Sequence, residues 1–195
     1  MEYTQTNQVT ARAAVKAVLV AIALLILPTA AAAVDKVTSS TALALQTPSA
    51  PIPDAALLDV GIPTLNDGLY LTDEDDTVFP EVRFAEAIYF SNQLAKVLEK
   101  SGAWGAIRVT PSTDVIMDIY INGIILQSDG ETMNLQITVE DTRGKKWFSK
   151  KYQHTTGKYA YDRRLKSLGD PFENLFVRIA NDVLAYREKL SDDQA

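Results

Sequence analysis

The stretch from Asp114 to Tyr152 constrains the fold of this 195-residue chain more than any other part. Near its middle, four apolar residues alternate with polar ones: Met133, Leu135, Ile137 and Val139. A period of two is typical of a β-strand with one buried face and one solvated face. The pattern therefore predicts a half-buried strand over 133–140.

Two short turns flank this strand and predict a three-stranded meander. Ser128-Asp129-Gly130 precedes it and Thr142-Arg143-Gly144 follows it. Glycine accepts the positive φ that such turns need. The outer strands are expected over 114–127 and 145–153. Gly123, inside the first of them, indicates a bulge or a close backbone approach.

The rest of the chain predicts one more layer of structure. The apolar segment 55–61 is expected to be an interior strand, and 104–110 a second strand. Pro80 opens a predicted helix over 81–101, and Asp170 and Pro171 open a second one. Spacings of three and four residues predict two buried stripes: Phe84, Ala87, Ile88, Leu94, Ala95 and Leu98 in the first helix, and Phe172, Leu175, Phe176, Ile179, Ala180, Val183 and Leu184 in the second.

The predicted order is strand, helix, strand, three-strand meander, helix. Glu173, three residues after Asp170, is expected to complete a capping box at the second helix. Helices that carry one apolar stripe each must bury it against a sheet. The sequence therefore predicts an α+β fold, with a single mixed sheet and two helices packed on one face.

The N-terminal residues have the layout of a secretory signal peptide. Arg12 and Lys16 precede the apolar run 17–27, and small residues follow up to Ala33. We expect cleavage after Ala33, periplasmic localisation and no stable membrane insertion after cleavage; the alternative is a retained N-terminal anchor. The predicted organisation is a signal peptide over 1–33, a flexible linker over 34–54, one domain over 55–190 and a disordered tail over 191–195.

Composition narrows the function classes. The chain has no cysteine, which excludes disulfides, thiol nucleophiles, zinc–thiolate sites and a lipid-modified cysteine. Without residues 1–33 it keeps 17 basic and 24 acidic residues. This acidity argues against nucleic acid as a partner.

No catalytic constellation is evident. His154 is the single histidine, and a catalytic or metal role would need an orienting partner or further ligands, so we expect an exposed structural residue. A carboxylate pair such as Asp118 and Glu140 on neighbouring strands is the alternative. We predict no enzymatic activity, no catalytic residue, no metal and no cofactor.

The region 143–166 is the most distinctive in charge. It holds nine basic residues and one acid, Asp162, and aromatic side chains are interleaved. Such a surface suits an acidic protein partner or, alternatively, a glycan or anionic polymer. A third possibility is that the region is a solvated edge strand, whose lysines discourage pairing with a strand of another chain. The candidate partner-binding residues are Arg143, Lys145, Lys146, Trp147, Lys150, Lys151, Tyr161, Arg163 and Arg164.

The hairpin from Leu135 to Trp147, with Asp141-Thr142-Arg143-Gly144 at its turn, supports a family resemblance. Together with the preceding elements it resembles the periplasmic domains of penicillin-binding-protein activator lipoproteins, of the curli secretion subunit and of the Tol–Pal propeller protein's N-terminal domain. Segments 101–109 and 170–184 are also similar to uncharacterised exported proteobacterial proteins. The resemblance implies non-enzymatic protein–protein work in a Gram-negative cell envelope, although this chain lacks a lipobox cysteine.

Overall fold

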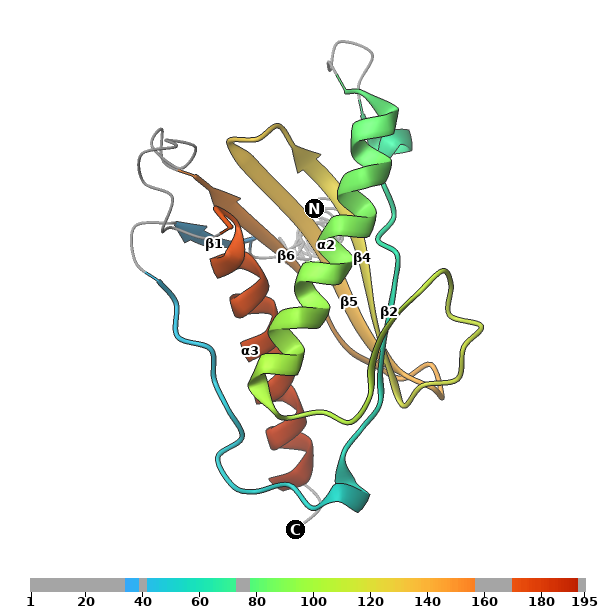
Figure 1. Cartoon of the computed structure of the whole chain (residues 1–195), viewed down its shortest axis with the longest axis vertical. Coiled ribbons are helices and arrows are strands. Elements are labelled where there is room, and N and C mark those ends of the chain that lie inside the picture. The colour runs from blue at the N-terminus through green and yellow to red at the C-terminus, as the bar shows by residue number, and fades with distance from the viewer. Residues whose placement is uncertain (1–33, 39–41, 73–77, 157–169, 193–195) are drawn as a thin grey trace, which may run out of the picture. The chain divides into compact units, whose positions relative to one another are not determined.

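The computed structural model describes residues 34–38, 42–72, 78–156 and 170–192, which fall in one compact unit. Within them, six strands form one mixed sheet in the order β1-β6-β5-β4-β2-β3, and two long helices cover one face of it (Figure 1). The predicted α+β fold is confirmed. The elements are β1 Val34–Thr38, β2 Val60–Pro63, α2 Pro80–Ser101, β3 Ile107–Thr110, β4 Ile119–Ser128, β5 Thr132–Asp141, β6 Lys146–Thr155 and α3 Glu173–Asp192, with short 3-10 turns at Asp54–Ala56 and Leu69–Leu71.

The meander is present as β4, β5 and β6, joined antiparallel in sequence order. All four alternating apolar residues of β5 are fully buried. Gly130 and Gly144 have φ values of 83° and 75°, as the predicted turns require. The first strand begins later than predicted, at Ile119. The residues before it form a loop, in which the Tyr120 hydroxyl donates to the carbonyl of Val115 at 2.7 Å.

Strand β2 lies inside the sheet, parallel to both β3 and β4, as its apolar composition predicts. It occupies Val60–Pro63 rather than 55–61, because Asp54–Ala56 forms a 3-10 turn. The Asp59 carboxylate accepts the N–H of Ala106 at 2.7 Å. That bond joins the chain just before β2 to the chain just before β3.

Helix α2 begins at Pro80 and is capped by Gly102 in the left-handed region, with φ 65°, as expected. Its buried face is rotated relative to the prediction. Phe84 and Ile88 are 52% and 55% exposed, whereas Phe90 and Val97 are buried beside Ala87, Leu94, Ala95 and Leu98. Polar residues facing inward set this rotation.

Arg83 and Ser91 are those inward-facing polar residues, and both are buried. The hydroxyl of Ser91 donates to the carbonyl of Ala87 at 2.9 Å and accepts the N–H of Leu65 at 3.0 Å. Because buried polar groups require partners, these contacts fix which face of α2 meets the sheet.

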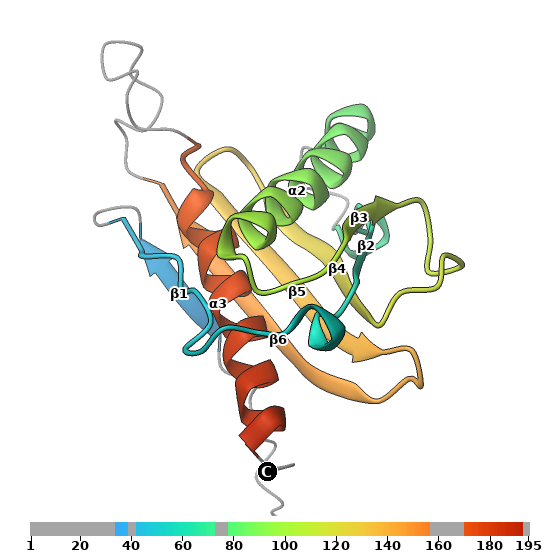
Figure 2. The ribbon, with the colours of Figure 1, turned by 60° about the horizontal axis from the view of Figure 1, so that its bottom comes forward.

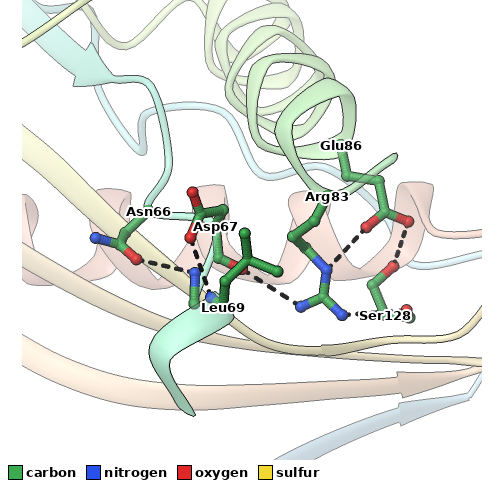
Figure 3. A network of polar contacts seen from close by, with 7 residues as sticks. Asn66, Asp67, Leu69, Arg83, Glu86 and Ser128 are labelled. Atoms are coloured by element: carbon green, nitrogen blue, oxygen red, sulfur yellow. Dashed lines mark hydrogen bonds and ion pairs between the residues drawn. The ribbon is translucent and has the colours of Figure 1, made fainter. Parts of the chain in front are cut away.

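Arg83 joins three segments in the network of Figure 3. Its Nε lies 3.3 Å from a carboxylate oxygen of Glu86, whose other oxygen accepts the Ser128 hydroxyl at 2.7 Å. The guanidinium also donates to the backbone carbonyls of Asp67 and Ser128, each at 3.4 Å. The network connects the loop after β2, the first turns of α2 and the end of β4.

Helix α3 packs on the sheet through its predicted stripe, which is buried from Phe172 to Leu184. The Asp170 carboxylate accepts the N–H of Phe172 at 2.8 Å, as expected of a capping residue. The predicted capping box is not formed through the Glu173 side chain, whose carboxylate lies 3.6 Å from Lys100 Nζ. The helix extends to Asp192, into the predicted tail; 193–195 lie outside the described residues.

The prediction of a flexible linker over 34–54 is corrected by the structure. Residues 34–38 form β1, which pairs in parallel with β6 at one edge of the sheet (Figure 2). Residues 42–53, here called the strap, run along α3, and Leu45 and Ile52 pack against the core. The packing of the strap could not be predicted from its own composition, because the residues that hold it lie on α3, more than a hundred positions later in the sequence.

The predicted signal peptide, residues 1–33, lies outside the described residues. In the part of the chain that is described, no helix is both long enough and apolar enough to cross a membrane.

Candidate functional site

A groove of about 760 Å³ lies between the strap, the turn from β5 to β6 and the C-terminal half of α3. Three of the predicted partner-binding residues line it: Arg143, Lys145 and Trp147. The opposite wall is the proline-rich part of the strap, Pro48 to Pro53. Leu58, Ile119, Leu184 and Leu190 add apolar surface.

The turn from β5 to β6 is held in shape by Asp141. Its carboxylate accepts the N–H groups of Arg143 and Lys145, each at 2.9 Å, and pairs with the Arg143 guanidinium at 3.0 Å. Burial raises the pKa of this carboxyl, but the hydrogen bonds from Lys145 and Arg143 outweigh it and lower the pKa overall. The turn thus presents Arg143, Lys145 and Lys146, all exposed, from a fixed backbone.

Trp147 forms a wall of the groove rather than an exposed platform. Its side chain is buried and stacks on Tyr186 of α3, with ring centroids 5.3 Å apart. Phe148 packs against the same tyrosine at 6.0 Å. These aromatic side chains are therefore engaged in holding β6 to α3.

Lys150 and Lys151 lie on opposite faces of the sheet, because successive residues of a strand alternate. Lys150 faces α3, where its Nζ lies 2.7 Å from an Asp182 oxygen that also accepts the Tyr152 hydroxyl at 2.8 Å. Lys151 faces away from the helices. Strand β1 pairs with β6 from Lys151 to Thr155, so the edge-strand interpretation is wrong for Lys151, and Lys150 is engaged by Asp182.

Tyr161, Arg163 and Arg164, the remaining predicted site residues, lie outside the described residues. Of the nine candidates, the structure therefore places Arg143, Lys145 and Trp147 together at the groove, with Lys146 beside them. It assigns Lys150 to an ion pair and Lys151 to the opposite face.

Sequence reasoning missed two residues of the groove, Arg187 and Glu188. Arg187 donates to the backbone carbonyls of Ala103 and Ala56 and lies over the Trp104 ring at 5.2 Å. Burial lowers its pKa. A signal was present, because position 187 continues the buried stripe of α3 and an arginine there needs buried carbonyl partners.

Glu188 connects α3 to the strap by accepting the N–H of Ser49 at 2.8 Å. The bonds from Ser49 lower the pKa of its carboxyl. Among the described residues that line the groove, Asp118, Asp141 and Glu188 balance Arg143, Lys145 and Arg187. The charge of the groove is therefore mixed, unlike the strongly basic window that the sequence suggested.

His154 is fully buried, so the prediction of an exposed histidine is wrong. The position follows Tyr152 by two residues in β6 and therefore shares its buried face. Within the described residues neither ring nitrogen has a hydrogen-bond partner, and the ring packs edge-on against Phe172 at 5.4 Å. Burial lowers its pKa.

The carboxylate pair considered from the sequence is not assembled as a unit. Asp118 accepts the N–H of Asp59 at 2.8 Å, whereas Glu140 accepts the side-chain amide of Asn122 at 2.9 Å. The described residues also contain no cluster of three or more side chains suited to a metal ion.

Comparison with known proteins gives little further information. No protein-family model matches the chain. No curated protein matches it either. A solved structure of a hypothetical protein from Chlamydia trachomatis is similar over 66% of this chain and 96% of its own, with 13% identity and a TM-score of 0.42. The resemblance to periplasmic activator, curli and Tol–Pal domains stays a prediction.

Proposed function

We propose that this chain is an exported, non-enzymatic binding or assembly module of a Gram-negative cell envelope, and that it acts through protein–protein contacts. The observation that carries the proposal is the groove beside the β5–β6 turn, where Arg143, Lys145 and Lys146 project from a backbone fixed by Asp141. A preorganised turn loses little entropy when a partner binds.

The mixed charge of the groove favours a protein partner. The groove is lined by apolar residues such as Leu184 together with acidic and basic side chains, a mixture that is typical of protein interfaces. The alternative, a glycan or anionic-ligand binding protein, depends on exposed aromatic rings for stacking. It has less support, because Trp147 is 8% exposed and already stacked on Tyr186.

The test is capture of partners from an envelope extract by the tagged wild-type chain and by two charge variants. Lys145→Glu reverses a charge at the groove, and Lys96→Glu makes the same change on the exposed side of α2. We expect one defined protein to be retained by the wild type and by Lys96→Glu and lost with Lys145→Glu. Retention should weaken as salt rises.

Equal retention by all three proteins would contradict the proposed surface. Titration of tryptophan fluorescence with peptidoglycan fragments and lipopolysaccharide addresses the alternative. A saturable change abolished by Lys145→Glu would favour the glycan or anionic-ligand function over the protein partner.

A further inference from the structure

We infer that residues 34–38 and 42–49 are the resident occupant of a polypeptide-binding face formed by β6 and α3, and that this face takes an extended segment of a partner protein when the resident segment leaves. The inference rests on the proposed function, because it names the chemistry of the partner. The face overlaps the groove at Ser49 and Glu188, but its test measures binding of a peptide at Asn181 rather than capture through Lys145, so the two proposals can fail separately.

The first observation is a repeated contact along α3. Asn174, Asn181 and Glu188, seven residues apart, accept the backbone N–H groups of Leu43, Gln46 and Ser49, which are three residues apart; each bond is 2.8 Å. Seven helical residues rise about 10.5 Å. Three residues of extended chain span about 9 to 10 Å. The two repeats match, so an extended polypeptide of this register fits along the helix.

The second observation is that the face binds mainly backbone, although the Ser49 side chain also bonds to Glu188. All three donors are main-chain N–H groups, and Asn181 also donates to the carbonyl of Ala44 at 3.0 Å. Strand β1 pairs with β6 in parallel over 34–38. Such contacts tolerate many sequences, as in proteins that bind a partner by adding its strand to a sheet edge.

Within residues 42–49, Leu45 is the apolar side chain that packs against the core and can give selectivity. Leu45 packs against the core between the two α3 contacts at Leu43 and Gln46. The side chains of Leu43, Gln46 and Ser49 are exposed. The favoured occupant is therefore an extended segment with an apolar residue at the position of Leu45 and unrestricted residues beside it.

Exposure makes the resident segment replaceable. Most strap residues up to Ala50 are exposed, so few apolar contacts hold them. Segments of this kind open at the lowest free-energy cost in a protein. Departure of β1 would leave the backbone groups of β6 unpaired, and an unpaired strand edge is a template for another strand. The resident segment competes with the partner. The partner's apparent affinity is its affinity for the open face multiplied by the fraction of molecules in which the face is open.

The test uses the full-length chain, a fluorescent peptide of residues 34–53 and a matched pair of substitutions. Gln46→Pro removes the N–H that Asn181 accepts, whereas Gln46→Ala keeps it. We expect Gln46→Pro to increase hydrogen exchange of the strap amides. It should also bind the peptide about five- to tenfold more tightly than the wild type. Gln46→Ala should behave as the wild type.

A second substitution maps the site. In the Gln46→Pro background, Asn181→Ala removes the acceptor on α3 and should reduce peptide affinity again. Peptide binding that is absent, that is equal in all variants, or that ignores Asn181→Ala would overturn the inference. So would unchanged exchange of the strap in Gln46→Pro. A dimer of Gln46→Pro would show that the occupant is a second copy of the chain, which also contradicts the inferred partner.

Discussion

Replacing His154 with leucine should remove a loss of stability that the natural chain suffers between neutral and mildly acidic pH. The imidazole lies at the end of β6, opposite Met133 of β5 and against the ring of Phe172. It is fully buried, and neither nitrogen has a hydrogen-bond partner in the described part of the chain. A proton on this ring would be a buried charge, with only the Pro171 backbone and the Asp170 carboxylate favouring it.

The sign follows from the lowered pKa of His154. Burial disfavours the protonated ring in the folded state, whereas in the unfolded chain it titrates near its ordinary pKa of about 6.5. As pH falls through that value the unfolded state takes up the proton first, so folding stability decreases until the lowered folded-state pKa is reached. The Pro171 backbone and, to a smaller extent, the Asp170 carboxylate oppose this effect, but burial outweighs both. Asp170 already accepts hydrogen bonds from Phe172 and Tyr89.

The size of the effect is limited by linkage to about 1.4 kcal/mol per pH unit for one proton. Between about pH 7.5 and about pH 5.5, the wild type should therefore lose about 1 kcal/mol more than His154→Leu. Urea unfolding of both proteins at both pH values measures this, because the titration of all other groups is shared. Parallel losses in the two proteins, or a wild type that gains stability on acidification, would refute the reasoning.

Three further perturbations follow from the packing. Gly68→Ala should lower the free energy of unfolding by several kcal/mol, because φ is 68° and a Cβ would lie 1.9 Å from the Ile125 carbonyl oxygen. Gly102→Ala is the control: φ is 65° but the space around it is open, so the loss in the same thermal-unfolding assay should be only about 1 kcal/mol. Lys150→Met should cost about 0.5 to 1 kcal/mol, an effect that shrinks in high salt, because the half-exposed pair with Asp182 is screened. The hydrogen bond from Ser49 to Glu188 should weaken below about pH 4.5, because the folded-state pKa of Glu188 is lowered and the stabilisation is lost as pH falls through that folded-state pKa. Hydrogen exchange of the Ser49 amide measures this, and protection that does not change with pH would contradict it.

The parts of the fold that the sequence predicted are those governed by short-range repeats. The alternation in β5 and the turn glycines at 130 and 144 are local, and both are found where expected. The face of α2 was not predictable in the same way. Phe84 and Ile88 continue an apolar stripe, but the hydrogen bonds of Arg83 and Ser91 to distant segments rotate it. A hydropathy pattern contains no information about these hydrogen bonds, so it could not predict which face of α2 is buried.

The candidate site shows a related difficulty. Counting charges along the chain groups Lys150 with Lys151, yet the pleat of β6 directs them to opposite faces and pairs one with Asp182. Arg187 and Glu188 reach the groove from α3, far away in the sequence. A surface assembled from distant segments cannot be read from the composition of one window.

Helix α3 connects the two surfaces that we propose. Its apolar stripe holds it to the sheet, and Asn174, Asn181 and Glu188 hold the strap, whose later residues form one wall of the groove. Loss of the strap from α3 would therefore open the polypeptide-binding face and remove that wall at the same time. Because Ser49 both bonds to Glu188 and lines the groove, occupation of the two surfaces is expected to be coupled through the strap.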